Sequence, residues 1–324
     1  MKLASLKYGR DGKLVVVSKD LSNYVSAESV ATTMQEALDN WQTAEPKLKT
    51  IYNDLENGKI AGEKFDPALC DAPLPRGYHW VDGSAYVTHV ELVRKARGAE
   101  LPASFWEDPL VYMGASDAFI GPHDDVLAGS EDWGIDFEAE VVVITDDVPA
   151  GTSAKDASEH IKLISIINDV SLRNLIPGEL AKQFGFYQSK PQTSFAPVFV
   201  TPDELGGAWD GKKIHLPLHA ILNGETVGSP NAGIDMTFDF CRLVEHSAKS
   251  RSLMAGTVIG SGTVSNKGSE DGSCCLAEVR CLETIANGKP TTPFMSFGDR
   301  VEIDMFDKDG KTIFGRIDQK VVKF

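Results

Sequence analysis

The segment from Phe137 to Ile144 places two carboxylates inside a strongly apolar strand. It reads Phe-Glu-Ala-Glu-Val-Val-Val-Ile, so Glu138 and Glu140 are two positions apart. Because strand side chains alternate between faces, both carboxylates lie on one face, which such an apolar strand would otherwise bury. Two like charges that close raise each other's pKa unless a cation lies between them. The segment therefore indicates either a metal site or a solvent-facing pair on an edge strand.

The bulk composition fits a soluble globular protein with room for two domains. Of 324 residues, 42% are hydrophobic and 24% charged, so the chain can bury a large core. Its formal net charge of −15 argues against nucleic acid binding, which needs a Lys/Arg surface. The sequence has no apolar run of membrane-spanning length and no apolar signal-peptide region after its first residues. We therefore expect a cytoplasmic protein with neither a nucleic acid nor a membrane partner.

The cysteines predict reduced thiols rather than a disulfide framework or a zinc ribbon. Their number is odd and no CxxC pair occurs among them, which fits a reducing compartment. They are Cys70, Cys241, Cys274, Cys275 and Cys281. We interpret the last three as part of a strand face, since no His or Cys has a suitable spacing for zinc.

The N-terminal residues 1–75 are predicted to form a small α+β domain. Residues 2–8 and 13–18 are typical of a hairpin around a glycine-containing turn. Residues 33–57 have the apolar spacing of an amphipathic helical region, which we expect to break at Pro46. A cluster of three prolines then indicates a linker to the next domain.

The remaining residues, 76–324, are expected to form a mainly β domain with a few helices. Residues 158–170 begin like a helix and continue as a strand, and residues 236–254 are predicted to be helical. Further strands are expected at Pro197–Val200, Lys213–Leu218, Val258–Ile259, Cys275–Leu282, Val301–Met305 and Ile313–Val322. The predicted fold class is therefore α+β, mainly β.

Two further segments bring polar side chains to the ends of apolar runs. An apolar strand ends at Asn168 and Asp169, with Arg173 one helical turn beyond. Asp169 in that position fits a metal ligand or a helix N-cap. Lys190 lies in a Ser/Thr/Pro loop, where its ammonium group fits either oxyanion stabilisation or an exposed surface position.

Common catalytic signatures are absent from the sequence. It contains no GxSxG, HExxH or GxxxxGK[ST] motif, and Gly260-Ser261-Gly262 is followed by Ser265 where a dinucleotide loop needs glycine. These absences argue against the usual hydrolase and nucleotide-binding classes.

Taken in order, these segments resemble the core of the fumarylacetoacetate hydrolase superfamily. The segments that carry the resemblance are Asp136 to Glu140, Asn168 to Arg173, Lys190 with Pro197, Gly260 to Ser265, and Cys274 to Glu278. In that family the last of these is expected to be a strand that follows a Gly-Thr loop. The resemblance covers roughly residues 76–324. It implies a mixed β-sandwich and β-roll catalytic domain preceded by a small α+β domain, as in the longer two-domain members.

The resemblance also implies a site. Longer members have an Asp seven residues before a His, supplying a metal ligand and the catalytic His, and Asp82 and His89 have this spacing. Asp117 and His123 form a competing pair in a turn that favours solvent. The implied metal ligands are Asp82, Glu138, Glu140 and Asp169. The implied catalytic residues are His89, Glu278, Lys190 and Arg173, with Tyr112 and Thr263 binding substrate.

An all-carboxylate site selects Mg²⁺ or Ca²⁺, with Mn²⁺ also suitable, over Zn²⁺. The resemblance implies that the cation holds a 1,3-diketone acid while His89, oriented by Glu278, activates water. Lys190, with Arg173, would stabilise the oxyanion. The expected reaction is hydrolysis of a carbon–carbon bond, with fumarylacetoacetate giving fumarate and acetoacetate in aromatic amino-acid (tyrosine) catabolism.

Three residues depart from the family pattern and leave the substrate open. Ser84, Asn174 and Ile176 stand where the family has Tyr, Asp and Gln. An acylpyruvate hydrolase, or a 2-oxo-acid decarboxylase or isomerase of the same superfamily, is therefore an alternative. A non-catalytic metal- or ligand-binding protein is the alternative from another class. Family resemblance implies a homodimer, and the segment from Ala85 to Arg97 is the candidate for a lid.

Overall fold

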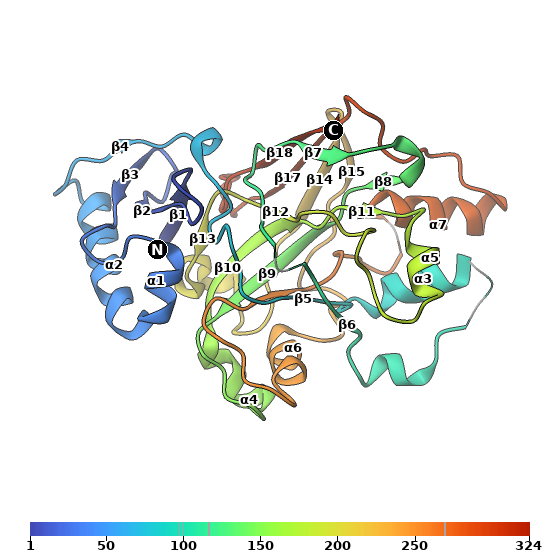
Figure 1. Ribbon diagram of the computed structural model, residues 1–324, viewed down its shortest axis with the longest axis horizontal. Helices are drawn as coiled ribbons and strands as arrows, with labels where there is room; N and C mark the ends of the chain where they lie inside the picture. The colour runs from blue at the N-terminus through green and yellow to red at the C-terminus, as the bar shows by residue number, and fades with distance from the viewer. Residues whose placement is uncertain (97, 99, 116, 269) are drawn as a thin grey trace.

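The largest β-sheet in the described part of the chain runs from the N-terminal residues through the body of the molecule (Figure 1). The computed structural model describes residues 1–96, 98, 100–115, 117–268 and 270–324, and eleven of the strands described there form this sheet. Its order is β4-β3-β2-β1-β13-β10-β9-β16-β5-β6, with β12 paired to β10. These strands are β1 (Lys2–Leu6), β2 (Lys13–Val17), β3 (Asn23–Ser26), β4 (Glu63–Lys64), β5 (Trp80–Gly83), β6 (Val111–Met113), β9 (Ala139–Thr145), β10 (Ile161–Asn168), β12 (Ser194–Phe195), β13 (Phe199–Val200) and β16 (Val258–Gly260).

The N-terminal part is a small α+β unit that extends this sheet. β1 and β2 pair antiparallel, which confirms the predicted hairpin, and β1 continues onto β13. Two helices, α1 (Met34–Asp39) and α2 (Trp41–Glu56), cover this part of the sheet. The predicted break at Pro46 is wrong, because α2 runs through Pro46 and the interruption falls at Asn40. Burial of apolar residues such as Leu48 offsets the hydrogen bond that proline cannot donate.

A second sheet packs against the first and closes the core. Its order is β15-β14-β17-β18-β7, and β14 and β17 lie against β9 and β10. Its strands are β7 (Val126–Ala128), β14 (Leu218–Leu222), β15 (Glu225–Gly228), β17 (Arg300–Met305) and β18 (Ile317–Lys323), and a separate pair joins β8 (Ile135–Asp136) to β11 (Ser171–Leu172). Buried side chains such as Val141, Ile164 and Ile303 fill the space between the layers. This arrangement confirms the predicted mainly β, α+β fold.

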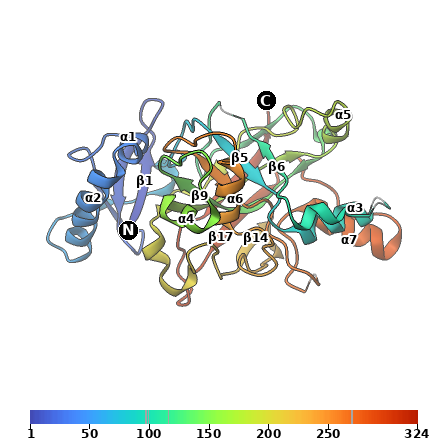
Figure 2. The same ribbon diagram turned by 90° about the horizontal axis from the view of Figure 1, so that it is seen from below.

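Helices lie at the ends and edges of the two sheets. α3 packs against α7 at one end of the molecule, and α4 packs against α6 (Figure 2). The helices of this part are α3 (Val87–Ala96), α4 (Ala154–Ala157), α5 (Ile176–Leu180), α6 (Phe240–Ser247) and α7 (Leu276–Asn287). The segment expected as a lid is largely α3, while Arg97 lies outside the described residues. None of the helices in the described ranges combines the length and apolar character needed to cross a bilayer.

The prediction of a strand over Cys275–Leu282 is wrong, because these residues begin helix α7. Cys275 is the N-cap, its sulfur accepting from the backbone N–H of Glu278, and Gly288 ends the helix with a φ of 79°. Glycine tolerates this left-handed conformation at a helix C-terminus. The apolar run that indicated a strand is instead the start of a helix whose first turn is buried.

Other predicted elements are displaced or shortened. The strand expected over Lys213–Leu218 begins only at Leu218, because Pro217 before it cannot donate to a ladder. The helix expected over residues 236–254 is α6 alone, which begins where Asp239 caps it. The strand expected from Ile313 starts at Ile317, after a turn at Gly315. The short helix and long strand predicted over residues 158–170 are confirmed.

Candidate active site

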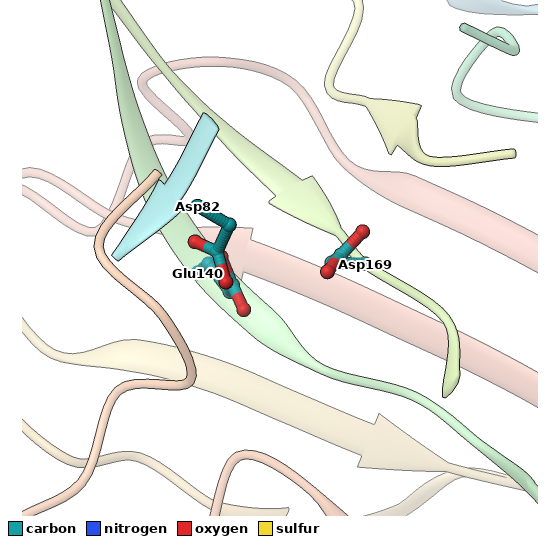
Figure 3. Close-up of side chains that lie close together, drawn as sticks. All are labelled: Asp82, Glu140 and Asp169. Carbon is teal, nitrogen blue, oxygen red and sulfur yellow. The ribbon is translucent and has the colours of Figure 1, made fainter. Parts of the chain in front are cut away.

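Three carboxylates come together on one side of the large sheet, near the ends of β5 and β10 and the start of β9. Asp82 lies on β5, Glu140 on β9, and Asp169 directly after β10. Each offers an oxygen within 4.8 Å of the others, and all three are buried (Figure 3). β16 lies between β5 and β9, which brings Gly260 opposite both Asp82 and Val142. Glycine there admits the acidic side chain, because a Cβ on Gly260 would lie 2.4 Å from Asp82 Oδ1.

The three carboxylates fit a divalent cation. Neither side-chain oxygen of Glu140 has a hydrogen-bond partner, although both are buried. Burial, reinforced by the neighbouring acidic charges, raises the pKa of Asp82 and of Glu140. A buried carboxylate without hydrogen-bond partners, as Glu140 is, lying beside two further acidic groups is costly unless a cation joins them. Oxygen-only donors suit Mg²⁺, Ca²⁺ or Mn²⁺, so Asp82, Glu140 and Asp169 are the residues that would hold the ion.

Glu138, expected as a fourth ligand, lies outside this group of three and is paired with two basic side chains. Its Oε1 accepts from Arg173 Nη2 at 2.6 Å, and its Oε2 accepts from Lys190 Nζ. Burial alone would raise the pKa of Glu138, but the charges of Arg173 and Lys190 lower it to about 2. Lys190 also donates to Asp169 Oδ2 at 2.6 Å. Lys190 thus bridges Glu138 and Asp169, which is one of the three clustered carboxylates.

His89 and Glu278 form a pair at the side of the same pocket. His89 Nδ1 lies 2.6 Å from Glu278 Oε2, and Ser273 Oγ donates to Glu278 Oε1 at 3.1 Å. The pair forms because α3 packs against α7, which brings together two residues that are 189 positions apart in the sequence. With Nδ1 bound to the carboxylate, Nε2 is the ring nitrogen left to exchange a proton.

The pocket brings together the residues expected from the sequence. It is lined by Asp82, His89, Tyr112, Glu138, Glu140, Arg173, Lys190 and Thr263. Asp169 and Glu278 do not line this pocket themselves, but Asp169 accepts from the Tyr112 hydroxyl at 2.6 Å and Glu278 is bound to His89. The competing pair is placed elsewhere, since His123 and Asp117 are exposed and neither lines this pocket.

Comparison with known proteins decides the family. The model of the fumarylacetoacetate (FAA) hydrolase C-terminal domain matches residues 78–322. The chain belongs to the fumarylacetoacetate hydrolase family. The model of fumarylacetoacetase N-terminal domain 2 matches residues 1–76.

Relatives within the fumarylacetoacetate hydrolase family differ in the reactions that their names state. A Bacillus subtilis protein named oxaloacetate tautomerase YisK is 29% identical over 201 residues, covering 61% of this chain and 62% of that protein. The structure of a fumarylacetoacetate hydrolase from Exiguobacterium antarcticum matches with a TM-score of 0.69 at 18% identity, covering 100% of both chains. A maleylpyruvate hydrolase from a Sphingobium species matches with a TM-score of 0.68 at 14% identity, also over 100% of both chains. At these identities the two structures show a shared fold alone.

Asp136 is a site residue that the sequence reasoning missed. Its Oδ2 accepts from Arg173 Nε at 2.8 Å and from the Ala277 N–H at 2.9 Å. Its Oδ1 accepts from the Leu276 N–H at 2.8 Å. One buried carboxylate therefore caps the helix that carries Glu278 and also fixes the arginine that holds Glu138. The period of two in Asp136, Glu138 and Glu140 is the sequence signal that would have included it.

Replacing Asp136 with asparagine is expected to lower the free energy of unfolding by about 2–4 kcal/mol. Asparagine has one acceptor oxygen for three donors, and it leaves Arg173 with Glu138 as its only ion-pair partner among the described contacts. Denaturant unfolding at neutral pH measures the change. The exposed Asp132, whose carboxylate makes no hydrogen bond or ion pair within the described part of the chain, is the control, and Asp132→Asn should change stability by less than about 0.5 kcal/mol. Equal effects of the two substitutions would contradict the positioning role.

Proposed function

We propose that the protein is a divalent-cation-dependent hydrolase that cleaves a carbon–carbon bond of a 1,3-dioxo carboxylic acid. The observation that carries the proposal is a His–Glu pair, His89 with Glu278, at a pocket lined by Asp82 and Glu140, which together with Asp169 form a cluster of three buried carboxylates. A proton-transfer group next to a cation site is what such a cleavage needs. Membership in the fumarylacetoacetate hydrolase family supports the same reaction class.

The residues of this chain divide the reaction between them. A cation bound by the three carboxylates would polarise the substrate's keto oxygen and stabilise the enolate that leaves. His89 takes a proton from water, which adds to the carbonyl, while Glu278 holds the ring and stabilises its charged form. Lys190 places a positive charge beside the developing oxyanion. The carbon–carbon bond then breaks, and the proton on His89 passes to the departing carbon, which restores the pair.

Keto–enol tautomerisation of a 2-oxo acid is the second candidate. It is supported by the Bacillus subtilis relative, whose name states oxaloacetate tautomerase. The same pair would move a proton between the carbon beside the keto group and the enol oxygen, without adding water. Ser84 and Ile176, at which this chain departs from the family's pattern, both line the pocket.

Turnover after removal of metal with EDTA is expected to be absent and to return when Mg²⁺, Mn²⁺ or Ca²⁺ is added. The measurement follows the diketone absorbance of fumarylacetoacetate and of acylpyruvates, with the products identified by mass spectrometry. Two acid products support hydrolysis, whereas an absorbance change without cleavage supports tautomerisation. Release of CO₂ from oxaloacetate would indicate a decarboxylase. Undiminished turnover in EDTA would contradict a role for the cation.

A further inference from the structure

Part of the pocket lining is apolar, next to its charged residues. Val90 and Val93 lie three apart on α3, so both face the pocket together with His89. Ile176 and Leu180 lie four apart on α5 and face the pocket in the same way. Phe186, from the loop after α5, completes this apolar wall, defined here as Val90, Val93, Ile176, Leu180 and Phe186.

The apolar wall is linked through Tyr112 to the group of three carboxylates. The rings of Phe186 and Tyr112 meet edge to face, with centroids 5.3 Å apart and an interplanar angle of 81°. The Tyr112 hydroxyl in turn donates to Asp169. Leu180 is 44% exposed, so part of the wall remains open to a ligand. A molecule whose head lies at the carboxylate group would therefore extend its remaining atoms along apolar side chains.

The basic side chains that line the pocket already have acidic partners. Arg173 is bound by Asp136 and Glu138, and Lys190 by Glu138 and Asp169. His89 is paired with Glu278. Among the described residues that line the pocket, no further Lys, Arg or His faces the apolar wall. A second carboxylate at the far end of a substrate would thus be desolvated there without a partner.

We propose that the apolar wall binds an apolar acyl tail, so that the substrate is a 1,3-dioxo acid with an alkyl or aryl group at its far end. This assignment rests on the proposed function, because it assumes that the dioxo head of the substrate binds at the cluster of Asp82, Glu140 and Asp169. It disfavours substrates with a carboxylate at the far end of the chain, of which fumarylacetoacetate is one.

The test is a calorimetric comparison of 2-oxohexanoate with 2-oxoadipate in the presence of Mn²⁺. The two acids have the same carbon chain, but the second ends in a carboxylate, and neither has the 1,3-dioxo group that is cleaved. We expect 2-oxohexanoate to bind at least about tenfold more tightly, because an unpaired charge is costly against apolar side chains. Across pyruvate, 2-oxobutanoate and 2-oxohexanoate, affinity should rise about three- to fourfold for each methylene group.

Leu180→Arg supplies the missing cation at the apolar wall and should reverse the preference toward 2-oxoadipate. Leu180 is partly exposed, so the substitution should leave the fold intact, as circular dichroism would verify. Leu69→Arg, at a 59% exposed position of the N-terminal part, is the matched control and should leave the preference unchanged.

Equal affinities, tighter binding of 2-oxoadipate by the unmodified protein, or no binding of either acid would overturn the apolar-tail assignment. An unchanged preference in Leu180→Arg would do the same. If the unmodified protein turns over a diacid and shows no binding preference, the proposed reaction stands and only the apolar-tail assignment is rejected. If the expected binding preference is found but no 1,3-dioxo acid is turned over, the apolar-tail assignment is supported and the proposed reaction is rejected.

Discussion

Replacing His89 with alanine is expected to lower kcat by about 100-fold to 10,000-fold while leaving cation binding nearly unchanged. The reason is that His89 is bound to Glu278 and contributes no atom to the group of Asp82, Glu140 and Asp169. Steady-state kinetics at saturating Mn²⁺ gives kcat, and titration calorimetry with Mn²⁺ alone gives the affinity for the cation. A loss of kcat without a loss of affinity separates proton transfer from metal binding.

A second variant shows whether the two residues act as one unit. Glu278→Gln should lower kcat by a smaller factor, because the imidazole remains but its charged form loses its partner. The double variant should be no slower than His89→Ala alone, as expected for groups that work together. His246→Ala, on α6 and outside the pocket lining, is the control and should leave kcat unchanged. Full activity of His89→Ala would favour a non-catalytic binding protein.

Local periodicity predicted the elements whose determinants are local. The hairpin of β1 and β2 and the long strand β10 follow from apolar patterns within a few residues. Helix α7 was predicted as a strand because much of its N-terminal capping comes from Asp136, which is 140 residues away in sequence from Leu276. No window around residues 275–282 contains that information. Tertiary capping therefore decided an element whose own residues were ambiguous.

The sequence predicted which residues form the site better than it predicted which of them pair with one another. Residue order and spacing, through the family resemblance, led to Asp82, His89 and Glu278, which the fold places in or beside one pocket. The sequence puts Glu138 and Glu140 on one face of a strand, and this predicts equal roles for them. Their difference arises because Arg173 and Lys190 come from other segments and pair with Glu138 but not with Glu140. The apolar wall was equally hidden, since valines and leucines at helical spacing are also what a buried core requires.

Glu140→Gln is expected to change the stability of the protein in opposite directions with and without a divalent cation. In EDTA the free energy of unfolding should rise by about 1–3 kcal/mol, because glutamine avoids the cost of burying, or of protonating, an acidic group beside Asp82 and Asp169. With Mn²⁺ at about 100 times its dissociation constant, the unmodified protein gains about 2.7 kcal/mol by binding the ion, and the variant loses this gain. Turnover of the variant should fall by at least about 100-fold, since a ligand atom is lost.

The crossover between the two conditions is what makes Glu140→Gln decisive. Substituting a residue of purely structural importance would destabilise the protein in both conditions. Substituting a metal ligand that is repelled by its neighbours in the metal-free site destabilises the protein only when the ion is present. Denaturant unfolding in EDTA and in Mn²⁺ measures both values, and Glu225→Gln, an exposed glutamate on β15, should change neither. Destabilisation of Glu140→Gln in EDTA would mean that the buried carboxylate is stabilised by the protein itself. The group of three acids would then no longer account for a metal site, and the chemistry proposed for His89 and Glu278 would have to proceed without a cation.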